Sequence, residues 1–585
     1  MYPLWKLSIC LSIRRYKGEL IMTEKKFMTV DGITVEINGE KNLLEVIRKI
    51  GIQMPTFCYY SELSVYGACR MCMVENEWGG FDAACSTPPK AGMNIKTNTE
   101  RLRKYRKNIL ELLLANHCRD CTTCEKNEKC KLQDFAMKFK IDGVRFPNTA
   151  DTSKAIDDSS PCIVKDTSKC ILCGDCVRMC NEVQNVGAID FAHRGSKMTI
   201  STAFDKPLAE TPCVGCGQCV SVCPTGAIVL NSEADKIWDA LHNKELKTTV
   251  QIAPAVRVAV AKELGVPENE NVMGKIVTAL RRMGFDEVYD TTIGADLTVM
   301  EETAEFIKRV EEGKNLPLIT SCCPAWIQFA EKKHPEFLPN ISTCRSPMQM
   351  LAAILKDQDK KNGVKSFHVA VMPCTAKKFE AARDEFKTEA GPNVDAVLTT
   401  KGLVRMIKEA GLMFDMLQPE GVDMPFGIVS GAGMIFGVTG GVTEAVLRRV
   451  SANKTHAELV SIESIGQRGL DGVKEFAIPF GETELKIAVV SGLGNAEKLL
   501  KRVKDGEHFD FIEVMACPGG CINGGGQPFA IREQKVKRSD NLYAIDRLSS
   551  VRRAEENPLI ENIYKDIIGD RAHELLHVHY HAKKK

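Results

Sequence analysis

Two cysteine runs with identical spacing constrain this chain more than any other feature. Both follow the pattern C-x2-C-x2-C-x3-C; the first ends at Cys180, and the second ends at Cys223 and is followed by Pro224. In a two-cluster ferredoxin, the fourth cysteine of each run ligates the cluster of the other run. Two zinc sites are a weaker alternative, because zinc sites rarely place three ligands at this spacing twice. The spacing therefore predicts two 4Fe–4S sites, one formed by Cys170, Cys173, Cys176 and Cys223 and the other by Cys180, Cys213, Cys216 and Cys219.

The cysteine content also indicates where the protein works. The chain has 24 cysteines in 585 residues, and most lie in tight runs, which suit metal sites better than disulfides. Ligands of this kind predict a reducing, cytoplasmic compartment. The formal net charge of +2 gives no electrostatic reason to bind nucleic acid or an acidic membrane surface. No apolar run reaches about 18 residues, so no membrane span is expected.

Residues 1–22 are predicted to be a disordered extension, or sequence upstream of a true start at Met22. Their apolar run, residues 7–13, precedes the pair Arg14-Arg15. A twin-arginine or secretory signal has the opposite order, with the apolar region after the basic residues. The N-terminus is therefore not expected to direct export.

A second cysteine set lies in residues 23–100, which combine two expected strands, residues 27–30 and 33–37, with a short amphipathic helix after them. Four thiolates on loops of a small β-rich domain suggest a 2Fe–2S cluster, although a four-cysteine zinc site fits the same spacing. Small residues beside one of these cysteines favour the cluster, since they let backbone amides approach the sulfur. The four members are spaced x10, x2 and x12: Cys58, Cys69, Cys72 and Cys85.

A third set lies in residues 101–145, which are basic and helical. It offers five candidate ligands for four places: His117, Cys118, Cys121, Cys124 and Cys130. A histidine-ligated 4Fe–4S site would use His117, whereas an all-thiolate site would use Cys118 in its place. The spacing alone leaves both choices open.

Residues 233–585 contain few cysteines and alternate between strand-like and helix-like stretches, which predicts parallel α/β layers. Three segments of this domain carry cysteines beside proline or glycine, and each follows a strand candidate or a short apolar stretch. Loops at strand ends are where α/β folds place functional sites. A buried apolar cysteine, the usual fate of a free one, would not need these neighbours. The segments are residues 320–326, 372–378 and 513–528, and the expected strands are residues 249–252, 368–372, 426–429, 486–490 and 511–515.

At these three segments the chain resembles the large subunit of the FeFe hydrogenases, whose signature motifs they match closely. The resemblance covers residues 25–585, and it implies that the N-terminal modules are the accessory-cluster domains of the multi-cluster members. The same modules resemble the start of the large iron–sulfur subunit of NADH dehydrogenase complexes. In those complexes the histidine-ligated site is standard, which favours His117 over Cys118.

The fold implied by the resemblance is multidomain, α+β and α/β. Its expected parts are a β-grasp 2Fe–2S ferredoxin domain at residues 23–100, a His/Cys3 4Fe–4S domain at 101–145, a two-cluster 4Fe–4S ferredoxin domain at 146–232, and a two-lobed α/β H-cluster domain at 233–585. The implied cofactors are one 2Fe–2S cluster, three 4Fe–4S clusters and the H-cluster. In this family the H-cluster is a 4Fe–4S cubane bridged to a diiron unit with carbonyl, cyanide and a dithiolate amine. No nucleotide or flavin is expected on this chain, because its short glycine motifs lack the third glycine of a dinucleotide fingerprint.

The resemblance also implies roles for individual residues. Lys377 matches the lysine that hydrogen-bonds a cyanide, and an ammonium is a compact donor for such an anion. Met372 and Pro254 match residues that line the same pocket. Four cysteines match the cubane ligands, with the last of them bridging to the diiron unit: Cys323, Cys374, Cys517 and Cys521.

A proton path is implied as well. Cys322 matches the proton-donating cysteine, and a free thiol, with a pKa of about 8.5, can carry a proton near neutral pH. In the expected helix at residues 299–312, Glu302, Glu305 and Arg309 stand at i, i+3 and i+7, on one face. They match the family's glutamate–glutamate–arginine path, with Ser342 between the glutamates. Taken alone, these residues would be a solvated charged face, as in most glutamate-rich helices.

The expected activity is the reversible reduction of two protons to molecular hydrogen, with electrons relayed through the accessory clusters. The expected partners are a flavin- and NAD(P)-binding subunit and a small 2Fe–2S subunit, and some such complexes bifurcate electrons with ferredoxin. A stand-alone ferredoxin-dependent hydrogenase is the alternative. A pure electron-transfer subunit of NADH dehydrogenase type would leave the four cysteines of the last domain idle. A hydrogenase-like iron–sulfur assembly or sensor protein would not need Cys322 and an intact proton path.

Two further features have no place in this scheme. The tail sequence His573-Glu-Leu-Leu-His577 is a nominal zinc-protease motif, but no convincing third ligand accompanies it. Its two leucines favour an amphipathic terminal helix instead. Four cysteines also have no assigned role: Cys10, Cys118, Cys162 and Cys344.

Overall fold

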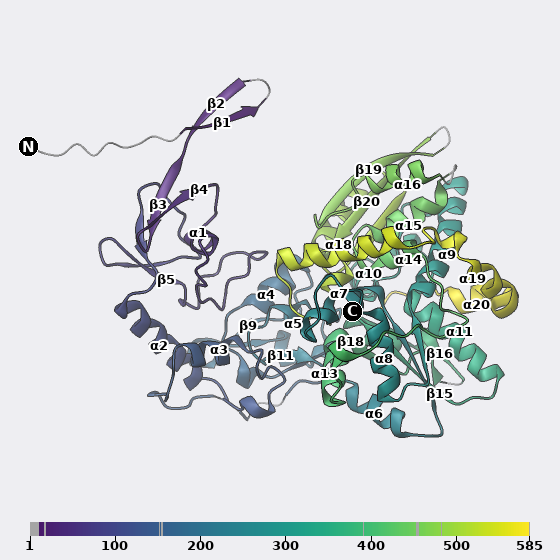
Figure 1. Ribbon diagram of the computed structural model, residues 1–585, viewed down its shortest axis with the longest axis horizontal. Coiled ribbons are helices and arrows are strands. Elements are labelled where there is room, and N and C mark those ends of the chain that lie inside the picture. The colour runs from purple at the N-terminus through teal and green to yellow at the C-terminus, as the bar shows by residue number, and fades with distance from the viewer. Residues whose placement is uncertain are drawn as a thin grey trace, which may run out of the picture.

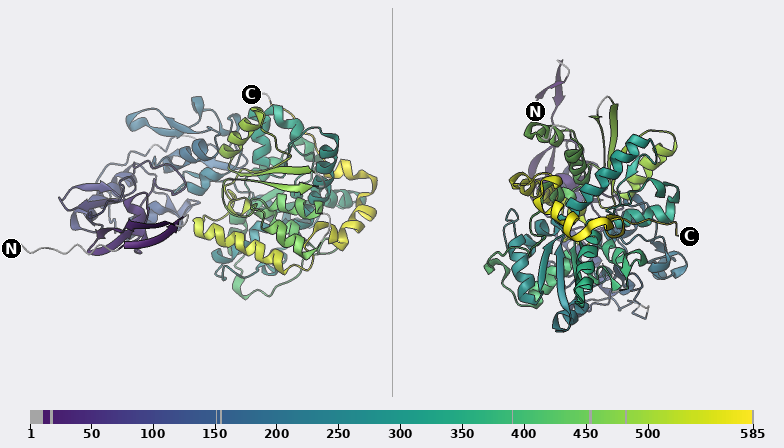
Figure 2. Two further views of the ribbon diagram at one scale, coloured as in Figure 1. Left: turned by 90° about the horizontal axis from the view of Figure 1, so that it is seen from above. Right: turned by 90° about the vertical axis from the view of Figure 1, so that its right-hand side faces the viewer.

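The structure is a computed structural model, which describes residues 11–16, 19–150, 152–153, 156–389, 391–451, 455–480 and 483–583. The molecule is elongated, with the N-terminal modules at one end and a larger C-terminal body at the other (Figure 1). Figure 2 shows the same division from above, with the blue segment between the two ends. Among the described helices, none is long and apolar enough to cross a membrane.

The first module is a five-stranded sheet in the order β4-β3-β7-β5-β6, against which helix α1 (Leu43–Lys49) packs. Leu43, Leu44 and Ile47 are fully buried, and Asn42 caps the helix by accepting a hydrogen bond from the Glu45 amide. The two predicted strands and the helix are therefore confirmed. The strands are β3 (Lys26–Val30), β4 (Ile33–Ile37), β5 (Met73–Asn76), β6 (Phe81–Ala83) and β7 (Asn94–Lys96).

The N-terminal extension differs in part from the expected disordered chain. Residues 1–10, with Cys10, and residues 17–18 lie outside the described residues, whereas β1 (Leu11–Tyr16) and β2 (Glu19–Glu24) pair as an antiparallel hairpin. The sequence at the start of β1 alternates between apolar and polar residues, which suits a strand. This part of the extension is therefore a strand pair.

Residues 100–230 follow as a series of short elements. Helices α4 (Asp175–Arg178) and α5 (Gln218–Val222) each start after a glycine with positive φ, Gly174 at 75° and Gly217 at 68°. Because this left-handed conformation favours glycine, the repeated cysteine pattern is also a repeat of backbone shape. The other elements are α2 (Glu100–Ala115), α3 (Lys131–Lys138), β8 (Ile163–Lys165), β9 (Asp190–Ala192), β10 (Thr199–Ser201) and β11 (Ile228–Leu230).

The C-terminal body contains a first sheet that is entirely parallel, in the order β13-β12-β15-β18. Its strands are β12 (Lys247–Ile252), β13 (Glu287–Asp290), β15 (Ser366–Met372) and β18 (Ala396–Thr399). The central strands β12 and β15 are buried from Thr248 and from His368 onward, as expected for a sheet with helices on its faces. Its helices are α6 (Ala234–His242), α7 (Pro254–Glu263), α8 (Met273–Met283), α11 (Pro347–Lys361) and α13 (Thr400–Glu409).

A second sheet in the same body has the order β14-β21-β20-β19 and is parallel except for β19. Its strands are β14 (Leu318–Ile319), β19 (Val473–Phe480), β20 (Thr483–Ser491) and β21 (Phe511–Met515). Helix α9 (Thr292–Glu312) lies between helices of this body. It contacts α11 and also α14 (Gly431–Met434) and α15 (Gly441–Val450). The remaining elements are α10 (Pro324–Lys333), α12 (Ala376–Ala381), α16 (His456–Glu463), α17 (Leu493–Lys504), α18 (Arg532–Leu548), α19 (Pro558–Asn562), α20 (Ala572–Leu576), β16 (Lys387–Thr388) and β17 (Gly391–Pro392).

Four of the five strands predicted in this body are confirmed, and the fifth is wrong. Residues 426–429 form no strand. Phe426 is instead a buried loop residue, whose ring packs edge-on against Tyr289 at 5.5 Å between centroids. Pro425 and Gly427 flank it, and both residues are unfavourable in a strand.

The segment with the two cysteine runs docks on the C-terminal body through glycine. A Cβ on Gly525 would lie 2.4 Å from the Cys216 carbonyl oxygen and 2.7 Å from the Gly217 Cα. On the other side of Gly217, the Thr375 hydroxyl donates a hydrogen bond to the Gly215 carbonyl at 2.5 Å. Real Cβ atoms do not approach backbone this closely, so the contact requires glycine at position 525.

Gly525→Ala is expected to force these two backbone segments apart, at a cost of about 1–3 kcal/mol for an overpacked site. The midpoint of thermal unfolding of the purified protein should fall. Gly421→Ala is the matched control, since a Cβ on Gly421 would meet nothing within 4 Å. An unchanged midpoint for Gly525→Ala would contradict the tight contact.

Candidate metal centre

Four cysteines from separate segments meet where strands of the two sheets end. Cys374 follows β15 in the first sheet, Cys323 follows β14 in the second, and Cys517 follows β21. Cys521 lies in the turn after Cys517. The Ala516 amide donates to the Cys323 sulfur at 3.4 Å. The carboxyl ends of parallel strands thus bring together the four cysteines of the last domain.

The electrostatics of these thiols reflect how close they lie. Burial raises the pKa of Cys374 to about 12, with a further contribution from Cys323. Burial also raises the pKa of Cys517 well above its usual value, with contributions from Cys374, Cys323 and Cys521. The four thiols cannot all ionise unless a cationic group replaces their protons. A donor set of four thiolates is the set that zinc and iron–sulfur clusters take.

A cavity with about 570 Å³ of atom-free space lies beside Cys374 and Cys521. Three of the predicted residues, Pro254, Met372 and Lys377, contribute to its lining. Most of the remaining lining is apolar, and a cavity of this kind holds a small group away from water. The apolar residues that were not predicted include Phe436, Met348 and Met515.

Lys377 brings a positive charge to this apolar cavity. Its ammonium donates to the Glu380 carboxylate at 2.7 Å and to the Cys322 carbonyl at 3.3 Å. Burial acts to lower the pKa of Lys377, but the charge of Glu380 raises it above the usual value, so the amine stays protonated. Glu380 was missed by the sequence analysis, although its position three residues after Lys377 on a helix is the one detectable signal.

Cys322 also lines the cavity, one residue before Cys323. Burial raises the pKa of its thiol well above the usual value, and the neighbouring Glu302 and Cys323 raise it further. The thiol therefore keeps its proton at neutral pH. Its position between the cavity and Glu302 suits a group that passes protons between the two.

Glu302 lies on the buried side of α9 and is 0% exposed, so it does not belong to a solvated charged face. Burial raises its pKa to about 8, and the charge of Glu305 adds to this effect while Ser342 opposes it. In the part of the chain that the structure describes, neither oxygen of its carboxyl group makes a hydrogen bond. A buried carboxyl group without partners is free to exchange a proton with either neighbour.

The predicted path continues from Ser342 to the surface. Ser342 donates to one Glu305 oxygen at 3.1 Å, and Arg309 donates to the other at 2.5 Å. The side chains of Glu305 and Arg309 are 14% and 11% exposed. The predicted residues therefore lie in the expected order between the cavity and solvent.

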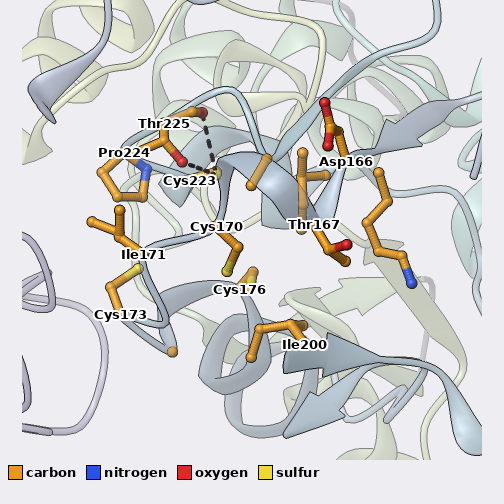
Figure 3. Close-up of a pocket in the computed structure, with 14 residues that line it drawn as sticks. Asp166, Thr167, Cys170, Ile171, Cys173, Cys176, Ile200, Cys223, Pro224 and Thr225 are labelled. Carbon is orange, nitrogen blue, oxygen red and sulfur yellow. Dashed lines mark hydrogen bonds between the residues drawn. The ribbon is translucent and has the colours of Figure 1, made fainter. Parts of the chain in front are cut away.

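The first ferredoxin-type set surrounds one pocket, as Figure 3 shows. Three of its cysteines come from the first run and the fourth from the second, which is the exchange that the spacing predicts. Burial raises the pKa of Cys173 and Cys176 well above the usual value. The four cysteines are Cys170, Cys173, Cys176 and Cys223.

The second ferredoxin-type set, Cys180, Cys213, Cys216 and Cys219, lies beside the four cysteines of the last domain, which are called the catalytic set below. Burial raises the pKa of Cys219, and the nearby Cys216, Cys213 and Cys180 raise it further. Cys374 adds to the burial that raises the pKa of Cys216, and Cys216 in turn adds to the raised pKa of Cys517. The two cysteine sets are thus adjacent across the glycine contact described above.

The four cysteines of the first module also gather. The Cys69 amide donates to the Cys58 sulfur at 3.3 Å, and hydrogen bonding with the Cys69 thiol raises the pKa of Cys58. Cys85 and Cys72 form the second such pair. Arg178 on α4 donates to the Cys58 carbonyl at 3.0 Å, which docks this module beside the first ferredoxin-type set.

The pocket of the third set contains all five candidates, His117, Cys118, Cys121, Cys124 and Cys130. The Nε2 atom of His117 is buried and has no hydrogen-bond partner among the described residues. Burial lowers the pKa of His117, which favours the neutral ring that metals bind. Lys126 of this module donates to the Cys223 carbonyl at 3.3 Å, so the third set also borders the first ferredoxin-type set.

Family models match five parts of the chain. The model "Iron only hydrogenase large subunit, C-terminal domain" matches residues 246–525, and "Iron hydrogenase small subunit" matches residues 532–583. The other matches are a 2Fe-2S iron-sulfur cluster binding domain at 27–100, the NADH-ubiquinone oxidoreductase-G iron-sulfur binding region at 106–145, and a 4Fe-4S dicluster domain at 169–227. The small-subunit match was missed by the sequence analysis, in which the terminal helix was the sole signal.

Several known proteins are similar over much of the chain. The NADP-reducing hydrogenase subunit HndD of Solidesulfovibrio fructosivorans is 41% identical over 580 residues, covering 95% of this chain and 99% of that protein. Iron hydrogenase 1 of Clostridium pasteurianum is 35% identical, covering 95% and 100%. Cytosolic iron-sulfur assembly component 3 of Mus musculus is 32% identical, covering 64% and 83%. A solved structure of the FeFe-hydrogenase HydA1 of Chlamydomonas reinhardtii is 36% identical with a TM-score of 0.52, covering 60% and 99%.

The raised pKa of Glu302 has a spectroscopic consequence. Because burial favours the neutral acid, Glu302 should be protonated at pH 7 and lose its proton as the pH rises through about 8. The infrared difference spectrum between the wild-type protein and Glu302→Gln should contain a carboxylic acid band that disappears over this range. Glu311→Gln, an exposed position on the same helix, should leave the band in place. A band already absent at pH 6 would contradict the shift.

Proposed function

The chain belongs to the family of the iron-only hydrogenase large subunit and is an FeFe hydrogenase catalytic subunit with accessory iron–sulfur clusters, and we propose that four cysteines of its last domain hold the H-cluster. At this centre the enzyme interconverts two protons, two electrons and molecular hydrogen. The residues that would hold this cluster are Cys323, Cys374, Cys517 and Cys521.

The meeting of these four thiols at the strand ends of two sheets carries the proposal. They lie beside a largely apolar cavity, and groups that can hold a proton extend from that cavity to the surface. A subunit that only transfers electrons needs neither feature. The resemblance to an iron–sulfur assembly component covers 64% of the chain, and the buried pair of Cys322 and Glu302 favours turnover over an assembly role.

When bound, the diiron unit supplies the chemistry that forms and cleaves the hydrogen–hydrogen bond. The protein's part is to position that unit and to move protons. The Lys377 ammonium, held by Glu380, is placed to donate to an anionic ligand in the cavity. Pro254, Met372 and Phe436 keep water away from the same space.

Protons move along side chains of the last domain in this proposal. Cys322 holds a proton at its sulfur beside the cavity and exchanges it with the buried carboxyl group of Glu302. Ser342 then connects Glu302 with Glu305, whose other oxygen is bound by Arg309 at the surface. For proton uptake the same groups act in the reverse order.

Electrons reach the catalytic cysteines through the accessory sites. We assign a 2Fe–2S cluster to the first module and three 4Fe–4S clusters to the other sets. The second ferredoxin-type set delivers electrons to the catalytic set, because Cys216 lies beside Cys374. Both N-terminal modules border the first ferredoxin-type set, which supports two entry points that meet there.

Cys322→Ala is expected to lower hydrogen evolution from reduced methyl viologen by about 10²–10⁴-fold, the usual size of a general acid–base contribution. The infrared bands of bound carbonyl and cyanide should remain, since Cys322 is not a proposed ligand. Glu302→Gln should likewise lose activity while it keeps the carbonyl and cyanide bands. Glu311→Gln should be as active as the wild-type enzyme. A fully active Cys322→Ala enzyme would remove that residue from the path.

The third set is proposed to hold a 4Fe–4S cluster through His117, Cys121, Cys124 and Cys130, with Cys118 outside the cluster. The unpartnered Nε2 of His117 in the shared pocket supports this choice. His117→Ala should therefore lose about four iron atoms per chain and one reduced-cluster signal in electron paramagnetic resonance. Cys118→Ser should retain both, and the opposite result would assign the site to Cys118.

The proposed physiological partners are a flavin- and NAD(P)-binding subunit and a small 2Fe–2S subunit. One extensive relative is named as a subunit of an NADP-reducing hydrogenase, which supports such a complex. The accessory modules lie at the end of the molecule away from the catalytic body, where a partner has access to them (Figure 1). Co-purification of a flavin subunit would separate this complex from the alternative, a stand-alone enzyme that exchanges electrons with ferredoxin.

A further inference from the structure

A group of metal-ligating side chains outside the iron–sulfur sites lies at the outer end of the proposed proton path. Glu305 comes from α9, Cys344 from the loop after Ser342, and His577 from the C-terminal tail. One ligand atom from each lies within 4.8 Å of the other two. We propose that these three residues bind a divalent cation of the Zn²⁺ type, which then blocks the path.

The three donors face one another. Arg309 binds one oxygen of Glu305, and the other oxygen lies 3.9 Å from the Cys344 sulfur. The Thr343 hydroxyl lies between Glu305 and His577, 3.2 Å from that oxygen and 2.9 Å from the Nδ1 atom of His577. Nitrogen, sulfur and carboxylate oxygen are the ligands that zinc takes in proteins, at about 2.0–2.3 Å. Small side-chain movements would bring all three within that distance of one ion.

His577 is also oriented in the way that zinc ligands are. Its Nε2 atom lies 3.0 Å from a carboxylate oxygen of Glu301, and Tyr564 donates to the other oxygen of that carboxylate. A carboxylate on the far ring nitrogen sets the orientation of a metal-binding histidine and raises its basicity. The Nδ1 atom is thereby left to face Glu305.

The backbone fixes two of the ligands relative to each other. Cys344 and His577 are paired in an antiparallel bridge, with the Val578 amide bound to the Thr343 carbonyl at 2.7 Å and the Arg345 amide bound to the Leu576 carbonyl at 2.7 Å. Cys344 is fully buried, whereas the His577 side chain is 12% exposed. An ion can therefore enter beside His577 and Glu305 and reach the thiol behind them.

A second acidic group in the described residues shows by contrast why this one suits a cation. Glu444, Glu463 and Asp546 also lie together, but three arginine side chains already pair with them: Arg448, Arg468 and Arg552. At the site of Glu305, Cys344 and His577, a single arginine, Arg309, pairs with one oxygen of Glu305, and the other oxygen faces the Cys344 sulfur. Burial raises the pKa of Cys344, and the charges of Glu302 and Glu305 raise it further. A bound cation would lower the pKa of this thiol.

An ion at this site would occupy the oxygen of Glu305 that now accepts from Ser342. Protons could then not pass from Ser342 to Glu305. The blocking effect rests on the proposed function, whereas the binding site itself does not.

Zinc-edge X-ray absorption of the chelator-treated holoenzyme with one equivalent of Zn²⁺ tests the site. The proposal expects one sulfur ligand near 2.3 Å together with nitrogen and oxygen ligands. Cys344→Ser should abolish the sulfur contribution, and His577→Gln should weaken zinc binding at least tenfold. Cys118→Ser and His581→Gln, which change another unassigned thiol and an exposed tail histidine, should leave both the sulfur contribution and the zinc affinity unchanged. A sulfur ligand that persists in Cys344→Ser, or binding through nitrogen and oxygen alone, would overturn the site.

Hydrogen evolution from reduced methyl viologen then tests the block. One equivalent of Zn²⁺ should inhibit the wild-type enzyme and the His581→Gln variant, and chelation should restore the activity of both. Cys344→Ser and His577→Gln should need at least tenfold more zinc for the same inhibition. If the absorption spectrum shows that zinc occupies the site but the enzyme is not inhibited, zinc does not block the path. This result would also count against a proton path through Glu305, but it would not change the assignment of the zinc ligands.

Discussion

A thiol that is buried among apolar side chains keeps its proton until a metal displaces it, and this constraint governs most of the structure. Burial raises the pKa of Cys173, Cys216 and Cys517 well above the usual value. Their thiolates become compatible with burial once a cluster supplies compensating positive charge. Tight turns at glycine and the ends of parallel strands bring the thiols close enough for that exchange. The fold and the loading of its clusters are therefore energetically coupled.

The accessory sites could be predicted from spacing, because most ligands of one cluster lie within a few residues of each other. The catalytic ligands required the resemblance, since Cys323, Cys374 and Cys517 are distant in sequence and meet only through two sheets. Glu380, Phe436 and His577 were not predicted as neighbours of the site, because contacts between distant segments leave no periodic pattern. Residues 426–429 were misassigned for a related reason: an apolar run signals burial, and burial occurs in loops as well as in strands.

The arrangement of the accessory sites restricts where electrons can go. Both N-terminal modules border the first ferredoxin-type set, and in the proposed relay electrons pass from there through the set of Cys216 to the catalytic set. The contact at Gly525 keeps the last two sets close, because any larger residue would separate the backbones. The proposed proton path runs instead along α9 towards the C-terminal tail.

The exchange of cysteines between the two runs has a consequence for synthesis on the ribosome. Cys170, Cys173 and Cys176 emerge early, but the fourth member of their set, Cys223, emerges after most of the second run. The first ferredoxin-type set is complete only after Cys223 has emerged, and the catalytic set is complete only after Cys521 has emerged. A nascent chain therefore carries incomplete thiol sets for much of its elongation. The accessory sets can therefore receive iron well before the catalytic set, whose last proposed ligand is synthesised long after theirs.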